Sequence, residues 1–150
     1  MKSKRTKAGA KAPAAAAMAL SQARLVELVQ EHHPEVQAIY LYGSYASEGQ
    51  RMDSDVDIAL LLPPGPQRGF RFHDPLRNAL EDLLGRSVDL VDLRRVSTVL
   101  QKEVLQADRL IFLGDRYAVD EFEMLTLSYY QKLNEERGAM VRDLVGEPLP

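Results

Sequence analysis

The stretch that most constrains the fold is a pair of apolar runs separated by a polar loop. The first run, Val36–Leu41, leads to the turn Gly43-Ser44, and the second run opens with Asp55 and Asp57. Runs rich in β-branched and aromatic residues favour strands. Side chains alternate along a strand with a period of two, so Asp55 and Asp57 share one face. The sequence therefore predicts two strands, with a pair of carboxylates at the start of the second.

These carboxylates and the preceding turn indicate a site for metal and phosphate. Two like charges at this spacing repel each other and are costly to desolvate. A divalent cation relieves both costs, because Mg²⁺ binds carboxylate oxygens and keeps positions open for phosphate oxygens. The turn at Gly43 and Ser44 can offer backbone N–H groups and a hydroxyl to a phosphate. Together these features predict nucleotide chemistry.

A third predicted strand, Ser87–Leu93, supplies two candidates for a further acidic ligand. Asp89 and Asp92 are three residues apart, so they face opposite sides of the strand. A fully buried acid without a partner is expensive, so at most one of them should point inward. The spacing alone leaves both acids open as the ligand, and the remaining one is expected in solvent.

The rest of the chain predicts helices packed on a small sheet. The expected elements are, in chain order, a helix capped by Ser21 and ending near His32, the strands Val36–Leu41 and Asp55–Leu62, a helix capped by Asp74 and stopped by Gly85, the strand Ser87–Leu93, a helix capped by Ser97, the strand Leu110–Leu113, and a long helix from Tyr117 that Gly138 interrupts or ends. This order predicts an α/β (α+β) fold, a small mixed β-sheet flanked by helices. His32 and His33 are both expected at the surface.

The last helix has apolar residues on more than one face. The stripe expected to pack on the sheet consists of Phe122, Leu125, Tyr129 and Leu133. Leu127 and Tyr130 fall off that stripe, and a wide apolar surface often marks a binding site for a partner. The alternative is a helix that is buried on all sides within the domain.

Composition limits the class of protein. The 150 residues suit one domain, there is no cysteine for a disulfide, and no apolar run approaches the ~20 residues of a membrane span. The net charge of −3 gives no sign of a nucleic-acid binder. We therefore expect a cytoplasmic protein with neither a membrane nor a nucleic acid as a direct partner.

Charge is unevenly distributed along the chain. The first 18 residues carry five positive charges and no acid, which leaves 14 basic and 22 acidic residues, or −8, for the remainder. We expect residues 1–18 to form a disordered basic tail and residues 19–150 to form the domain with its C-terminal helix. A targeting peptide is the alternative for the tail, although its single arginine argues against a transit peptide.

The spacing from Gly43-Ser44 to Asp55 and Asp57 gives the motif G-S-x10-D-x-D. This motif resembles the signature of the DNA polymerase β-like nucleotidyltransferase superfamily. The chain resembles most its minimal nucleotidyltransferases, the MntA-type antitoxins paired with HEPN-domain toxins. The resemblance covers roughly residues 21–144. It implies the polymerase β-like nucleotidyltransferase fold, and it matches the family's third carboxylate to Asp89.

The resemblance also implies a mechanism and site residues. Catalysis and metal binding would fall to Asp55, Asp57 and Asp89, which would hold one or two Mg²⁺ ions. Gly43 and Ser44 match the phosphate-binding turn of the family, and Arg51 could meet the triphosphate from the loop. Tyr42 is expected in the core, and His73 is a further candidate for contact with the nucleotide.

The implied reaction is transfer of AMP from ATP to a protein hydroxyl, with release of pyrophosphate. The implied acceptor is a tyrosine of a cognate HEPN ribonuclease toxin, with which the chain would form a hetero-oligomer. One alternative is a small-molecule nucleotidyltransferase of the aminoglycoside type, but 150 residues leave little room for the second helical domain that such enzymes carry. The other is a binding module that blocks its toxin sterically.

Overall fold

The computed structural model describes residues 11–43, 55–66, 68–69 and 71–146. Its elements are, in chain order, α2 (Lys11–His32), β1 (Ala38–Tyr42), β2 (Val56–Leu61), α3 (Asp74–Leu84), β3 (Val88–Asp92), α4 (Thr98–Gln106), β4 (Leu110–Leu113) and α5 (Arg116–Val145). The predicted order of helices and strands is therefore confirmed. Among these residues, no helix combines the length and the apolar character that a bilayer crossing requires.

The four strands form one mixed sheet in the order β3-β2-β1-β4. Strand β1 pairs antiparallel with both β2 and β4, whereas β2 and β3 are parallel. A parallel pair needs a crossover connection, which α3 provides between β2 and β3. The predicted mixed sheet is confirmed, and β1 and β2 lie at its centre.

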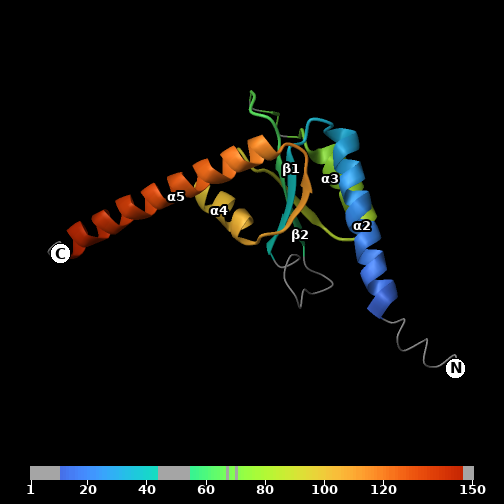
Figure 1. Cartoon of the computed structure of the whole chain (residues 1–150), viewed down its shortest axis with the longest axis horizontal. Coiled ribbons are helices and arrows are strands. Elements are labelled where there is room, and N and C mark those ends of the chain that lie inside the picture. The colour runs from blue at the N-terminus through green and yellow to red at the C-terminus, as the bar shows by residue number, and fades with distance from the viewer. Residues whose placement is uncertain (1–10, 44–54, 67, 70, 147–150) are drawn as a thin grey trace.

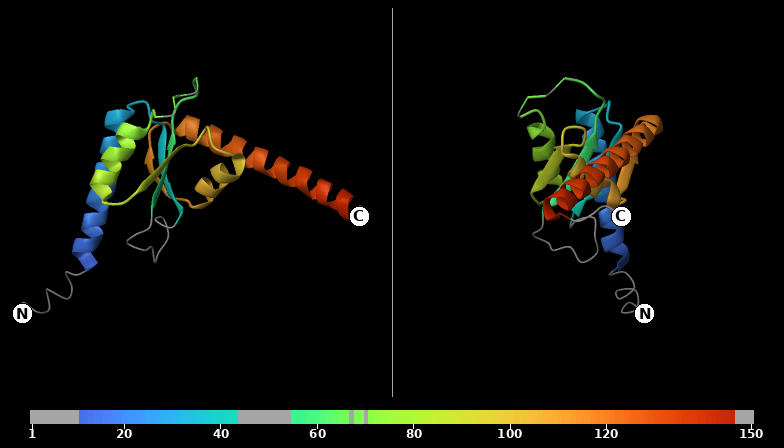
Figure 2. Two further views of the ribbon diagram at one scale, coloured as in Figure 1. Left: turned by 180° about the vertical axis from the view of Figure 1, so that it is seen from behind. Right: turned by 90° about the vertical axis from the view of Figure 1, so that its left-hand side faces the viewer.

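Helices cover both faces of the sheet, as Figures 1 and 2 show. On one face, α2 and α3 bury Leu25, Val29, Leu76 and Leu80 against the sheet. On the other face, α4 and α5 bury Val104, Val119 and Phe122. Every residue of β2 except Asp57 is buried, which is typical of a strand covered on both sides and explains its nearly continuous apolar run.

Several helix ends follow their predicted capping residues. Ser97 accepts a hydrogen bond from the backbone N–H of Leu100 at 3.2 Å and starts α4. Gly85 ends α3 in the left-handed conformation, with a φ of 66°. Asp74 is the first residue of α3 rather than its cap, because His73 occupies the cap position.

Helix α2 begins at Lys11, so the predicted start at Ser21 is wrong. The added residues contain four consecutive alanines, and alanine has the highest intrinsic helix propensity. Pro13 stands in the first turn, where proline is tolerated. Residues 1–10 lie outside the described residues, and the division of the chain into tail and domain stays a prediction.

Helix α5 runs without interruption through Gly138 to Val145, so the predicted break at Gly138 is wrong. One glycine in a helix costs only ~1 kcal/mol relative to alanine, which strong helix formers around it can offset. The helix ends at Gly146, whose φ is 71°. At ~1.5 Å per residue such a helix is longer than the sheet is wide, and its C-terminal half extends away from the domain in Figure 1.

The packed stripe of α5 differs from the predicted one. Its buried residues are Val119, Phe122 and Thr126, whereas Leu125 and Tyr129 are 41% and 60% exposed. Asp115 caps the helix through the backbone N–H of Ala118, and Glu123 accepts a hydrogen bond from the Tyr40 hydroxyl at 3.2 Å. Relative to the prediction, α5 is rotated about its axis, so that a different side of the helix packs on the sheet. The apolar pattern alone does not specify this rotation.

His33 is buried, with 5% of its surface exposed, so its predicted surface position is wrong. Its ring centroid lies 5.3 Å from that of Phe72 and 5.6 Å from that of His73. The loop before α3 places these rings over the end of α2, and local sequence gave no sign of this contact. His32 is exposed, as predicted.

Candidate active site

The strand register brings the predicted acids to one end of the sheet. Asp57 of β2 pairs with Asp89 of the parallel strand β3, and with Tyr42 of the antiparallel strand β1. These three residues are therefore neighbours across three strands, on the face that α4 and α5 cover. Asp55 lies just before β2 and is exposed. Spacing alone did not decide whether Asp89 or Asp92 is the third acidic ligand. The register places Asp89 beside Asp57.

Gly43 lies directly against Asp57. A Cβ atom built on Gly43 would come within 2.1 Å of Oδ2 of Asp57, and the φ of Gly43 is +68°. Both the close approach and the left-handed backbone exclude an ordinary side chain at this position. The turn after β1 therefore brings the backbone into contact with the central carboxylate.

The end of the sheet that holds these acids has an excess of negative charge. Burial raises the pKa of Asp57, and the charges of Asp89 and Asp55 raise it further. Burial also raises the pKa of Tyr42, again with contributions from Asp89 and Asp57. A carboxyl whose pKa is raised in this way is stabilised by a nearby cation. The donor set, carboxylate oxygens at an open edge, suits Mg²⁺ or another hard divalent ion.

The acids do not form a closed cage. Within the described ranges, no three histidine or acidic side chains are gathered closely enough to hold a metal ion by themselves. Asp55 and Asp89 are exposed, and only Asp57 is half-buried. Mg²⁺ is usually bound through one or two carboxylates together with water and substrate phosphates. The open arrangement is therefore compatible with an ion that arrives with a nucleotide.

Two predicted nucleotide-binding residues, Ser44 and Arg51, lie outside the described residues. Their roles stay predictions. His73 is described, but it lies where α3 begins, beyond the end of β2 that is opposite to the acids. There its ring contacts His33 and Phe72, and the suggested contact with a nucleotide at the acids is not compatible with this position.

Asp92 is not solvated, contrary to expectation. Its side chain is 10% exposed and its Oδ2 lies 3.2 Å from Nη1 of Arg68. Its Oδ1 accepts a hydrogen bond from the backbone N–H of Arg94 at 3.3 Å. The loop before α3 brings Arg68 to this acid, and no local pattern in the sequence predicts that approach. The prediction that Asp89 and Asp92 face opposite sides holds.

Glu103 of α4 is an acid that sequence reasoning missed. Its charge contributes to raising the pKa of both Asp57 and Tyr42, so this exposed side chain lies near the same end of the sheet. Its place depends on how α4 packs on the sheet, and the helical pattern of residues 98–106 carries no such information. Glu103 adds to the negative potential of the site.

Residues 24–117 match the family described as polymerase beta, nucleotidyltransferase. The matched segment contains all four strands and every candidate site residue, and it is more than half of the chain. The chain belongs to the polymerase beta nucleotidyltransferase family. The acids and the glycine turn thus lie in the domain that defines these enzymes.

This nucleotidyltransferase is also similar to a named enzyme. It is 35% identical over 126 residues to the protein adenylyltransferase MntA of Shewanella oneidensis, covering 84% of this chain and 88% of the relative. The chain is therefore a homologue of MntA over nearly the whole length of both proteins.

Two solved structures extend this similarity to three dimensions. A toxin–antitoxin complex with AMP-PNP contains a chain that is 33% identical, with a TM-score of 0.69, over 83% of this chain and 98% of that one. A tri-AMPylated Shewanella oneidensis HEPN toxin in complex with its MNT antitoxin contains a chain that is 32% identical, with a TM-score of 0.65, over 84% and 97% of the two chains. The predicted nucleotidyltransferase fold is confirmed.

Proposed function

We propose that this nucleotidyltransferase transfers AMP from ATP to a tyrosine hydroxyl of a cognate HEPN ribonuclease toxin and thereby acts as its antitoxin. The observation that carries the proposal is the placement of Asp57 beside Asp89 and against Gly43, in a homologue of MntA. The relatives in toxin complexes, one of them with an AMPylated toxin, support the choice of acceptor. Because ATP is an intracellular substrate, we place the reaction in the cytoplasm.

In this proposal Asp55, Asp57 and Asp89 bind one or two Mg²⁺ ions. When bound, the metal neutralises phosphate charge and lowers the pKa of the acceptor hydroxyl. The acceptor oxygen forms a bond to the α-phosphorus of ATP as the bond to the β-phosphate breaks and pyrophosphate leaves. Asp89, which is exposed on the edge strand β3, accepts the proton of the hydroxyl.

The remaining residues hold the nucleotide. Gly43 keeps the turn tight against Asp57, so that backbone N–H groups of the turn can approach a phosphate. Ser44 donates its hydroxyl to a phosphate oxygen, and Arg51 contacts the triphosphate. Catalysis then depends mainly on positioning and on charge neutralisation.

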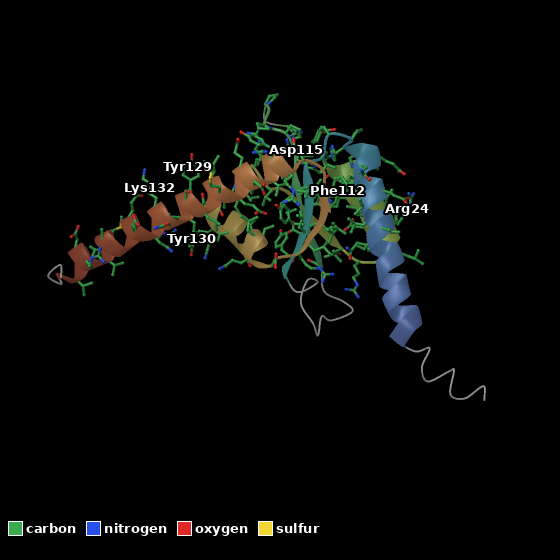
Figure 3. All side chains as sticks on the ribbon, viewed as in Figure 1. Arg24, Phe112, Asp115, Tyr129, Tyr130 and Lys132 are labelled. Atoms are coloured by element: carbon green, nitrogen blue, oxygen red, sulfur yellow. The ribbon has the colours of Figure 1, made fainter. Side chains whose placement is uncertain are left out.

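The part of α5 from Met124 to Val145 is the proposed docking surface for the toxin. Its exposed large apolar residues are Met124, Leu125, Leu127, Tyr129, Met140, Val141, Leu144 and Val145. Figure 3 shows Tyr129 and Tyr130 on different sides of α5. Tyr130 is half-buried, with Nζ of Lys102 4.0 Å from its ring centroid. We therefore place the aromatic centre of the surface at Tyr129 rather than at Tyr130.

The exposed surface of α5 also favours a second candidate, a steric antitoxin that binds the toxin without modifying it. Both candidates predict a complex, and only the first predicts a covalent product. The test is to incubate the toxin with this chain, ATP and Mg²⁺, and to measure the intact mass of the toxin. The proposal expects one or more added AMP groups. An unmodified toxin that is nevertheless neutralised by the Asp55→Asn/Asp57→Asn double variant would establish the steric candidate.

A further inference from the structure

A second charged site lies at the opposite end of the sheet from the acids. There a pocket of about 230 Å³ opens where β2 and β3 end. We call it the arginine pocket, and it is lined by Pro63, Pro64, Gly65, Arg68, Asp92, Arg94 and Arg95. The candidate active site lies at the start of β2 and β3, so the two sites have no residue in common.

The arginines are held in place by contacts within the domain. Arg94 donates through Nε to the carbonyl oxygen of Leu62 at 2.6 Å and through Nη2 to Oε1 of Gln37 at 2.7 Å. Its guanidinium also lies 5.5 Å from the ring centroid of Phe122. These contacts fix a half-buried cation at the end of the sheet. A guanidinium fixed in this way loses little further freedom when it binds an anion.

The other two arginines are anchored to the walls of the same pocket. Arg68 pairs with Asp92 at 3.2 Å and lies 5.1 Å from the ring centroid of Phe72. Arg95 donates to the carbonyl oxygen of Gly65. Each guanidinium has five N–H donors, and these bonds among described residues use only one from each side chain. Donors that can reach a ligand therefore remain on both.

The charge of the lining is not balanced. Three arginines face one aspartate, a formal excess of +2, in a chain whose residues after the first 18 carry −8. Burial lowers the pKa of Arg94, and the charges of Glu121 and Asp92 raise it again. Since arginine keeps its charge at any physiological pH, the pocket is a local positive centre on an acidic domain.

We propose that the arginine pocket binds a small phosphate-bearing anion, either pyrophosphate or the phosphate of a free mononucleotide. Guanidinium groups bind phosphate oxygens through paired, charge-assisted hydrogen bonds. Pro63 and Pro64 fix the backbone of one wall, and the volume accommodates one or two phosphate groups. Because the acids lie at the other end of the sheet, this anion is bound in addition to the substrate nucleotide.

The test is a titration of the full-length chain with pyrophosphate in the presence of EDTA. The backbone amide NMR signals are recorded at each pyrophosphate concentration. Omission of Mg²⁺ suppresses phosphate binding at the acids and separates this test from the proposed transferase activity. Saturable shifts are expected at Gly65, Arg94 and Arg95, with half-saturation near or below about 1 mM. AMP should shift the same signals, and adenosine, which has no phosphate, should not. Whichever of pyrophosphate and AMP binds more tightly identifies the source of the phosphate.

Substitutions locate the anion. Arg95→Gln should weaken binding about tenfold, because one charge-assisted contact is lost. Arg95 is exposed, so this variant should keep its fold. The matched control is Arg71→Gln, an exposed arginine of the same loop that does not line the pocket, and it should bind as the wild type does. Shifts centred on Gly43 and Asp89, no saturation, or equal weakening by both variants would overturn the proposal.

Discussion

The two ends of the parallel pair β2–β3 treat their acidic residues in opposite ways. At the start of the strands, Asp57 faces Asp89, and no ion pair among the described residues involves either of them. At their end, Asp92 is paired with Arg68. The two acids of β3 are three residues apart, yet one is held without a counter-charge and the other is neutralised. The comparison teaches that the unneutralised acid marks the end of the sheet where a cation and its ligand are expected.

The largest expected difference between the two ends is that between the variants Asp89→Asn and Asp92→Asn, in both AMP transfer and folding stability. Asp89→Asn should lower AMP transfer roughly a hundredfold or more, because a metal ligand and proton acceptor is lost, and its melting temperature should stay unchanged. Asp92→Asn should keep transfer but lose about 1–2 kcal/mol of folding stability, because Arg68 loses its charged partner. Activity assays and thermal melts of both variants check this. The reverse pattern would mean that Asp92, not Asp89, belongs to the site.

Gly43→Ala tests the contact between the turn and Asp57. The left-handed φ of Gly43, and the distance of 2.1 Å that its added Cβ would have from Oδ2 of Asp57, require the backbone or the carboxylate to move. We expect a loss of about 1–3 kcal/mol of stability, with a parallel loss of transfer. Gly69→Ala is the matched control, since no atom lies within 4 Å of its added Cβ. Equal melting temperatures of the two variants would argue against the tight turn.

Asp57→Asn should make the protein slightly more stable while it abolishes transfer. The pKa of Asp57 is raised above its ordinary value of 3.8, so the folded state disfavours the ionised carboxylate. At pH values above 3.8, ionisation of Asp57 therefore costs folding stability. The uncharged amide of the variant does not have this cost. Chemical denaturation at about pH 7 should therefore show a small gain in the free energy of unfolding. A clear loss of stability would show that Asp57 has a stabilising partner.

The opposite end should respond to acid through its histidines. Burial lowers the pKa of His33 and of His73 from the ordinary value of 6.5. Above that value both rings are neutral whether the chain is folded or unfolded. As the pH falls below it, the unfolded chain binds protons more readily than the folded chain does, and folding stability is lost. Melting curves from about pH 7.5 to pH 5 check this effect.

A matched pair of variants assigns that pH dependence. His73→Asn should flatten the loss of stability in acid, because one of the two neutral rings is removed. His32→Asn changes an exposed neighbour of His33 and should leave the loss as it is in the wild type. If His32→Asn flattened the curve instead, the buried pair of rings would not be its cause.

The sequence predicted the strands well because their signals are local. The apolar runs, the period of two and the capping residue Ser97 act over a few residues, and the observed strands begin and end within two residues of their predicted limits. The neighbouring positions of Asp57 and Asp89 followed from the same alternation together with a family resemblance. Features of this kind depend on backbone geometry that each short segment specifies by itself.

The wrong limits of α2 and α5 concern local helix propensity, whereas the other errors concern contacts between segments that are distant in the sequence. The pairing of Asp92 with Arg68 and the burial of His33 both depend on the loop before α3. The rotation of α5, which exposes Tyr129 and turns Tyr130 toward Lys102, depends on how the helix docks on the sheet. A hydrophobic stripe predicts that a helix has a buried side, but a shift by one residue changes which side chains form it.

ATP binding measured by calorimetry, with Mg²⁺ and with EDTA, tests most directly the claim that the acids at the start of β2 and β3 form a site for metal and nucleotide. The wild type should bind ATP at least about tenfold more tightly with Mg²⁺, because the cation neutralises both the carboxylates and the phosphates. The Asp55→Asn/Asp57→Asn variant should lose that difference. Equal affinity of the wild type for ATP in Mg²⁺ and in EDTA would contradict the account.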